Sequence, residues 1–129
     1  MEDLSEINCL LVEDDVQIGS YIRKLLVKQE WIKCVHHVTS IAEVMPWLDS
    51  QNYHLILLDL GLPDGSAIEY IATYMARQPK AKILIFTQQD EEQVVLNAFS
   101  KGADGYLVKS THDDALIAMI RPQLQGGTP

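Results

Sequence analysis

Short, almost wholly apolar runs alternate along this chain with longer stretches in which apolar residues recur at helical spacing. Strong runs lie at 7–12, 54–60 and 81–87, a weaker one lies at 31–37, and a fifth lies at 104–108. Such a run predicts a strand that is buried on both faces of a sheet. Five strands alternating with helices through short loops predict a doubly wound α/β domain with a parallel sheet, because parallel crossovers place helices on both faces.

The stretches between the runs predict five helices. Ser40 followed by Glu43 is a capping-box pattern, Pro46 predicts a kink or irregular turn in the second helix, and Asp90 and Thr111 are expected caps of the last two. The inward positions that we expect are Ile18, Ile22, Leu25 and Leu26; Ile41, Val44, Met45 and Leu48; Ile68, Ile71, Ala72 and Met75; Val94, Val95, Ala98 and Phe99; and Leu116, Met119 and Ile120.

Size and charge restrict the functions that this chain can have. Its 129 residues suit one domain, which we expect at 1–124, with a tail or the start of a linker at 125–129. The excess of 18 acidic over 10 basic residues gives a net charge of −8, which disfavours nucleic-acid binding by this chain itself. No apolar run approaches the roughly 20 residues of a membrane span. We therefore expect a cytoplasmic protein without a membrane partner.

The two cysteines carry no signature of a site. Cys9 and Cys34 lie far apart, and neither has a cysteine or histidine at the spacing of a zinc site. We therefore expect small hydrophobic side chains rather than a disulfide or a metal centre.

Polar side chains follow four of the predicted strands at their carboxyl ends. Glu13 and Asp14 follow the first strand, Asp59 ends the third, Thr87 the fourth and Lys109 the fifth. Open parallel sheets bind ligands beyond these ends, so the side chains meet in one pocket if the four strands are neighbours. Clustered carboxylates repel one another, and a hard cation with oxygen ligands relieves the repulsion, which predicts Mg²⁺.

The same residues suit phosphoryl transfer. A carboxylate can attack an activated phosphoryl group and form an acyl phosphate when cationic groups offset the charge. Lys109 supplies such a charge, and the Thr87 hydroxyl can donate to a phosphoryl oxygen. Each residue alone has a structural interpretation: acids cap helices, threonine fills strands, and lysine ends them. Asp15 fits the role of a helix cap, whereas the joint pattern favours a site.

Four segments of the chain resemble the signature segments of the response-regulator receiver domains of bacterial two-component systems. The likeness spans residues 7 to about 122 and implies a flavodoxin-like (βα)5 receiver fold with strand order 2-1-3-4-5. It also implies a phosphorylation switch rather than an enzyme in the ordinary sense. The segments are LLVEDD at 10–15, LLDL at 57–60 together with PDG at 63–65, ILIFT at 83–87 and GADGYLVK at 102–109.

The resemblance implies a role for each acidic residue. Asp59 would accept a phosphoryl group from a sensor histidine kinase or a small phosphodonor. Asp14 and Asp59 would bind Mg²⁺ directly together with the backbone carbonyl of Gly61. Glu13 would act mainly through metal-bound water.

The resemblance also implies a conformational response. Thr87 and Lys109 would contact the attached phosphoryl group. Movement of Thr87 toward the phosphate would be coupled to inward rotation of Tyr106, which would remodel the face made by the fourth helix, fifth strand and fifth helix. That face is also where we expect a homodimer to form.

Three positions depart from the family pattern. Gln88 stands where a small residue is usual, Ser110 where proline is common, and Gly61 where a larger side chain often lies. We expect Gln88 to narrow access to the pocket. We expect the peptide bond before Ser110, and hence the loop there, to be trans rather than cis. We expect Gly61 to leave the site more open.

Two other functions compete with the phosphorylated receiver. One is a pseudo-receiver that acts as a protein-interaction module without phosphate. Gln88 is the residue that leaves this alternative open. The other is a phosphohydrolase with an aspartate nucleophile, which requires a second acid at the position of Gly61.

The segment at 102–109 is similar to receivers that precede a helix-turn-helix DNA-binding domain, so binding to DNA would require a domain outside this chain. A stand-alone regulator is the alternative.

Overall fold

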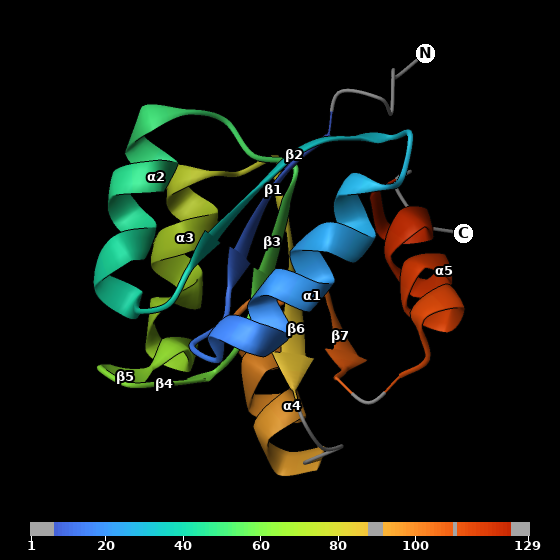
Figure 1. The fold of residues 1–129 in the computed structure, drawn as a ribbon. Coiled ribbons are helices and arrows are strands. Elements are labelled where there is room, and N and C mark those ends of the chain that lie inside the picture. Colours follow the sequence, from blue (N-terminus) through green and yellow to red (C-terminus); the bar gives the residue numbers. More distant parts are fainter. Residues whose placement is uncertain (1–6, 88–91, 110, 125–129) are drawn as a thin grey trace.

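The computed structural model describes residues 7–87, 92–109 and 111–124 (Figure 1). Short strands and helices alternate through this part of the chain, as expected. In chain order the elements are β1 (Ile7–Val12), α1 (Val16–Val27), β2 (Ile32–Val38), the 3₁₀ turn η2 (Ile41–Glu43), α2 (Val44–Ser50), β3 (Leu55–Leu58), β4 (Gly61–Leu62), β5 (Gly65–Ser66), the 3₁₀ turn η3 (Ala67–Tyr70), α3 (Ile71–Arg77), β6 (Lys82–Thr87), α4 (Glu92–Ser100), β7 (Gly105–Val108) and α5 (Asp113–Leu124).

The main sheet has five parallel strands in the order β2-β1-β3-β6-β7. Counted along the chain, these are strands 2-1-3-4-5, so the predicted topology is confirmed. Val12 pairs with Leu58, and Thr87 pairs with Val108. The residues that follow these pairs therefore emerge at the same edge of the sheet.

Helices cover both faces of the sheet (Figure 1). One apolar core joins the sheet to α1 and α5 through residues such as Leu26 and Ile120. A second core joins the opposite face to α2, α3 and α4 through residues such as Leu48, Ile71 and Ala98. Strands β1 and β3 are buried on both faces, which explains why their sequences are almost wholly apolar.

Several predicted inward positions are wrong. Met75, Phe99 and Met119 are 37%, 39% and 44% exposed, and Ala72 is exposed as well. In α3 the error has a clear cause, because the segment begins with the 3₁₀ turn η3 and the α-helix itself begins only at Ile71. The change of helical period rotates the buried stripe away from Met75.

The start of the second helix is irregular, as Pro46 predicts. The 3₁₀ turn η2 precedes α2, and Pro46 lies in the first turn of α2, where a missing amide hydrogen costs no helical hydrogen bond. The predicted capping box does not form, because the Ser40 side chain makes no cap hydrogen bond. The carboxylate of Glu43 accepts from the amide of Thr39 and from the hydroxyl of Ser40, rather than from the amide of Ser40.

Other expectations about local structure had mixed outcomes. Helix α5 begins at Asp113, so His112 and not Thr111 precedes it, and the two-residue strands β4 and β5 had not been predicted. The expected cap Asp90 lies outside the described residues. Both cysteines are free thiols, Cys9 buried and Cys34 half-buried. Among the described residues, no helix is both long and apolar enough to span a membrane.

Candidate functional site

The turn between β1 and α1 brings Glu13 to the sheet edge in a fully buried position. Its amide donates to the carbonyl oxygen of Val38 at 3.0 Å, and its carboxylate accepts from the amide of Asp15 at 3.1 Å. Asp15 in turn caps α1, because its carboxylate accepts from the amides of Gln17 and Ile18. The predicted helix-cap role of Asp15 is therefore confirmed, and the acidic turn is tied to both neighbouring elements.

Asp59 follows β3 and lies beside that turn. Its amide donates to the carbonyl oxygen of Val12 at 2.9 Å, which extends the pairing of β3 with β1 by one residue. Its carboxylate accepts from the amide of Gly61 at 3.3 Å, and the residue is 9% exposed. Asp59 is therefore held by its backbone, while its side chain reaches the surface of the pocket.

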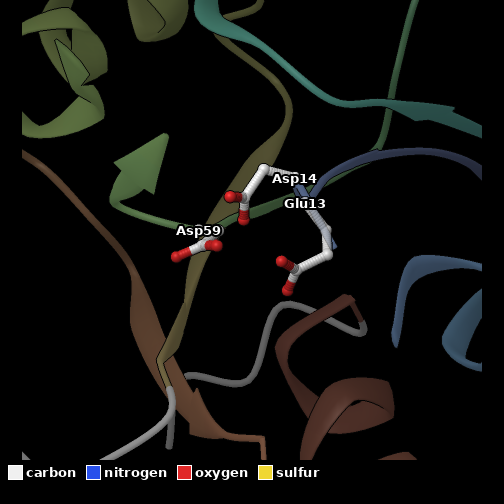
Figure 2. A group of neighbouring side chains, drawn as sticks. All are labelled: Glu13, Asp14 and Asp59. Carbon is white, nitrogen blue, oxygen red and sulfur yellow. The ribbon is translucent and has the colours of Figure 1, made fainter. Parts of the chain in front are cut away.

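Three carboxyl groups gather at this edge (Figure 2). Glu13, Asp14 and Asp59 each offer an oxygen, and these three oxygens lie within 4.8 Å of one another. Asp14 is exposed, whereas the other two are buried. Carboxylate oxygens at this spacing are the donor set of a hard divalent cation such as Mg²⁺, so the residues present fit the predicted metal.

Lys109 places a positive charge between two of the carboxylates. Its Nζ lies 2.6 Å from Glu13 Oε1 and 3.1 Å from Asp59 Oδ2, and its side chain is 11% exposed. Its Nζ donates a hydrogen bond to Asp59, whereas the contact with Glu13 Oε1 lies outside hydrogen-bond geometry and is ionic. Burial disfavours the ammonium, but the two carboxylates outweigh burial and raise the pKa of Lys109.

Burial also changes the titration of Glu13. Desolvation raises the pKa of Glu13 to about 7, although the neighbouring Lys109 lowers it and Asp59 raises it further. Keeping Glu13 ionised in this buried position costs free energy. A buried acid with a strongly shifted pKa beside a lysine is typical of a functional site.

A pocket of about 460 Å³ opens between these residues. Thr87 at the end of β6 and Lys109 directly after β7 line it, and the amide of Lys109 donates to the Thr87 carbonyl at 2.6 Å. Gly61 lines it too, and a Cβ added there would meet nothing within 4 Å, so this wall is open as expected. The complete lining is Glu13, Asp14, Asp15, Ile18, Asp59, Leu60, Gly61, Thr87, Val94 and Lys109.

Tyr106 does not line this pocket. It lies on β7, half-buried, and meets the ring of Phe99 edge to face at 6.2 Å between centroids. The structure thus brings six of the seven predicted site residues together and places Tyr106 against the end of α4. Gln88 and Ser110 lie outside the described residues.

Two residues near the site had not been predicted. His37 on β2 lies with its Nε2 2.8 Å from the carbonyl oxygen of Glu13. Asp64 follows β4, and its carboxylate accepts from the amides of Ile41 and Ala42 at 2.9 and 3.0 Å, which caps the turn η2 from another segment. The PDG segment at 63–65 was the only sequence signal for Asp64, and nothing in the sequence singled out His37.

Known proteins share both the sequence pattern and the fold. The family model of the response regulator receiver domain matches residues 9–121. The cell cycle transcriptional regulator CtrA of Caulobacter vibrioides is 35% identical over 112 residues, which make up 86% of this chain and 47% of that protein. The chemotaxis protein CheY of Listeria monocytogenes is 26% identical over 111 residues, covering 86% of this chain and 93% of that protein.

A solved structure agrees with these relatives. A two-component response regulator from Clostridium difficile has a TM-score of 0.86 at 22% identity, covering 96% of this chain and 100% of that one. This likeness shows the fold. The chain spans about half the length of curated relatives such as CtrA.

Proposed function

The chain belongs to the response regulator receiver domain family, and on that basis we propose that it is a switch that accepts a phosphoryl group on Asp59. One observation carries this proposal. The Asp59 carboxylate faces a pocket in which Lys109 Nζ lies 3.1 Å away and Thr87 forms a neighbouring wall. A nucleophile, a fixed cation and a hydroxyl donor therefore surround the space in which a phosphoryl group would lie.

The reaction is a substitution at phosphorus. A carboxylate oxygen of Asp59 forms the new P–O bond, and the bond from phosphorus to the donor breaks. The electron pair of that bond leaves with the donor, which is the imidazole nitrogen of a phosphohistidine or the acyl oxygen of acetyl phosphate. The product is an acyl phosphate on Asp59. Attack by water at its phosphorus would break the bond to the Asp59 oxygen, release inorganic phosphate and restore the carboxylate.

Glu13, Asp14, Asp59 and the carbonyl of Gly61 would hold Mg²⁺ in this reaction. When bound, the ion supplies positive charge that stabilises the phosphoryl oxygens during transfer. Lys109 supplies a second, permanent charge to those oxygens once the phosphoryl group is attached. The Thr87 hydroxyl donates to the same group, which gives the product contacts that the free carboxylate lacks.

Phosphorylation at this site would change the conformation of the neighbouring surface. Thr87 ends β6, and Tyr106 lies on the adjacent strand against Phe99 of α4. A shift of Thr87 toward the phosphoryl group, followed by rotation of Tyr106, would change the face made by α4, β7 and α5. We propose that this face forms the homodimer or contacts the output partner.

The remaining assignments follow from the family. A sensor histidine kinase is the proposed phosphodonor, acting in the cytoplasm. We further propose that the receiver comprises residues 1–124, with 125–129 as a C-terminal tail or the start of a linker. CtrA is a transcriptional regulator, and this supports transcription as the output through a DNA-binding region outside this chain. The protein is a signalling domain, and its only catalysis would be its own phosphorylation and dephosphorylation.

Intact-mass measurement tests the proposal. The protein is incubated with acetyl phosphate and Mg²⁺, alongside Asp59→Asn and the control Asp49→Asn, which removes an exposed acid of α2 outside the pocket. We expect a gain of one phosphoryl group on the parent and the control, none on Asp59→Asn, and loss of the gain in EDTA. A gain that persists in Asp59→Asn would contradict the acceptor assignment. A parent modified neither by acetyl phosphate nor by a phosphorylated histidine kinase would favour the pseudo-receiver.

A further inference from the structure

His37 makes a specific contact with the acidic turn. Its Nε2 lies 2.8 Å from the backbone carbonyl oxygen of Glu13. A carbonyl oxygen can only accept a hydrogen bond, so Nε2 must carry the proton and donate. His37 lies on the face of β2 that turns toward α1, because its strand neighbour Val35 packs into the core beneath α1 and α5.

The contact replaces a missing sheet hydrogen bond. Strand β1 ends at Val12, and its pairing with β2 ends at Val38. The Glu13 amide still donates to the Val38 carbonyl, whereas no backbone amide of the described residues donates to the Glu13 carbonyl. The His37 side chain donates to it there, so both backbone polar groups of Glu13 are fixed to β2.

Helix α1 is shaped to admit the His37 ring. A Cβ added at Gly19 would lie 2.1 Å from His37 Cε1 and 2.2 Å from Nε2, far inside contact distance. Gly19 is buried, and its φ is negative, so the absence of a side chain serves the close approach of the ring rather than an unusual backbone. The ring is thereby confined between the α1 backbone and the Glu13 carbonyl.

We propose that His37 is a positioning residue for the divalent cation. By fixing the Glu13 carbonyl, it orients the turn from which Glu13 and Asp14 present their carboxylates toward Asp59. The inference rests on the proposed function, since it concerns the same cation site. It differs from a packing role, because packing requires only the volume of the ring, whereas positioning requires the donor.

Variants at this position separate the donor from the ring. His37→Phe keeps an aromatic ring without a donor, His37→Ala removes both without pressing on α1, and His37→Gln places an amide donor at similar reach. The matched control is His36→Phe. His36 is the adjacent residue of β2 but points to the opposite face, where its ring stacks on Trp47 at 4.3 Å.

The readout is the Mg²⁺ dissociation constant, measured by calorimetry without a phosphodonor, together with urea unfolding in EDTA. We expect His37→Phe and His37→Ala to raise Kd about fivefold, the change that corresponds to one net hydrogen bond. His37→Gln should restore an affinity close to that of the parent. His36→Phe should leave the affinity unchanged even if it lowers the stability of the fold.

The outcomes distinguish this inference from the proposed function. A parent that binds Mg²⁺, with unchanged affinity in both donor-free variants, overturns the inference alone. Equal weakening in His37→Gln and His37→Ala also overturns it, because the donor would then be irrelevant. A parent that binds no Mg²⁺ overturns both the inference and the metal dependence of the proposed function.

Discussion

Two turns deliver carboxylates to the same pocket, and they are held in opposite ways. In the turn after β1, Glu13 is fully buried, and its amide, carbonyl and carboxylate all have partners within the fold. Gly19 admits the ring that completes this arrangement. In the turn after β3, Asp59 is anchored by its amide, but its carboxylate borders the open pocket, and the space beside Gly61 is empty.

The difference separates two tasks. A charge that must hold a cation gains from a fixed position, because no reorganisation is then needed when the ligand binds. A carboxylate that must attack a phosphoryl donor requires room for the donor to approach. We therefore regard the first turn as the rigid half of the site and the second as its accessible half. Substitutions in the two halves should differ accordingly.

Lys109 contacts both halves, so its removal should have the largest effect. Lys109→Met leaves the buried Glu13 carboxylate without its ionic partner, and we expect the free energy of unfolding to fall by about 3 kcal/mol, the low end for breaking a buried pair, because the pocket opens to water. Urea unfolding in EDTA measures the change. Lys101→Met, at an exposed lysine, is the control. Equal stability of Lys109→Met and the control would show that the contact of Lys109 with Glu13 contributes nothing to the free energy of unfolding.

Gly19→Ala tests the rigid half directly. The added methyl group collides with the His37 ring, and overpacking of this kind should lower the free energy of unfolding by about 1–3 kcal/mol. Thermal unfolding of the variant beside the parent measures it. A stability equal to or above that of the parent would mean that the ring moves aside without cost, and the turn would then not be rigid.

Asp64→Asn tests how the accessible half is anchored at its far end. Hydrogen bonds from the amides of Ile41 and Ala42 lower the pKa of Asp64, so the folded state favours its charged form. That stabilisation is present above the ordinary pKa of an aspartate and is lost as the pH falls through the lowered value.

We therefore expect Asp64→Asn to melt below the parent at pH 7, by less than Gly19→Ala does, and the difference to shrink in acid. Thermal unfolding from pH 7 down to pH 3 checks both points. Glu30→Gln, which removes an exposed carboxylate elsewhere, controls for net charge. A difference that grows as the pH falls would reverse the predicted sign.

Gly61→Ala should have the smallest effect of the series. A Cβ at this position meets nothing within 4 Å, and its φ is not positive. We expect the free energy of unfolding to change by no more than about 0.5 kcal/mol, as at an ordinary surface position. Urea unfolding of the variant beside the parent measures the change in the free energy of unfolding. Destabilisation as large as that of Gly19→Ala would erase the contrast between the two turns.

The sequence predicted the parts of the fold that depend on local pattern. Apolar runs located the five strands of the sheet, because strands buried on both faces tolerate few polar residues. Stripe positions such as Met75 and Phe99 were wrong, because the phase of a short helix depends on where it begins. The ribbon of β4 and β5 has too few residues to produce a pattern.

The candidate site divides in the same way. The sequence pointed to three site residues because each follows a strand that its apolar run predicted. These residues are Glu13, Asp59 and Lys109. The contacts of His37 and Asp64 could not, because each joins segments that only the tertiary fold brings together. Both residues act on backbone groups, and a sequence does not show which backbone groups lack partners.

Chemical mapping of the phosphoryl group tests the central claim most directly. Hydroxylamine attacks the carbonyl carbon of an acyl phosphate, releases phosphate and leaves a stable hydroxamate on the acceptor residue. The protein would be treated with acetyl phosphate and Mg²⁺, trapped with hydroxylamine, digested and sequenced by mass spectrometry. The account predicts a hydroxamate on Asp59, in the accessible turn. A hydroxamate on Asp14 or Glu13, in the rigid turn, would contradict it.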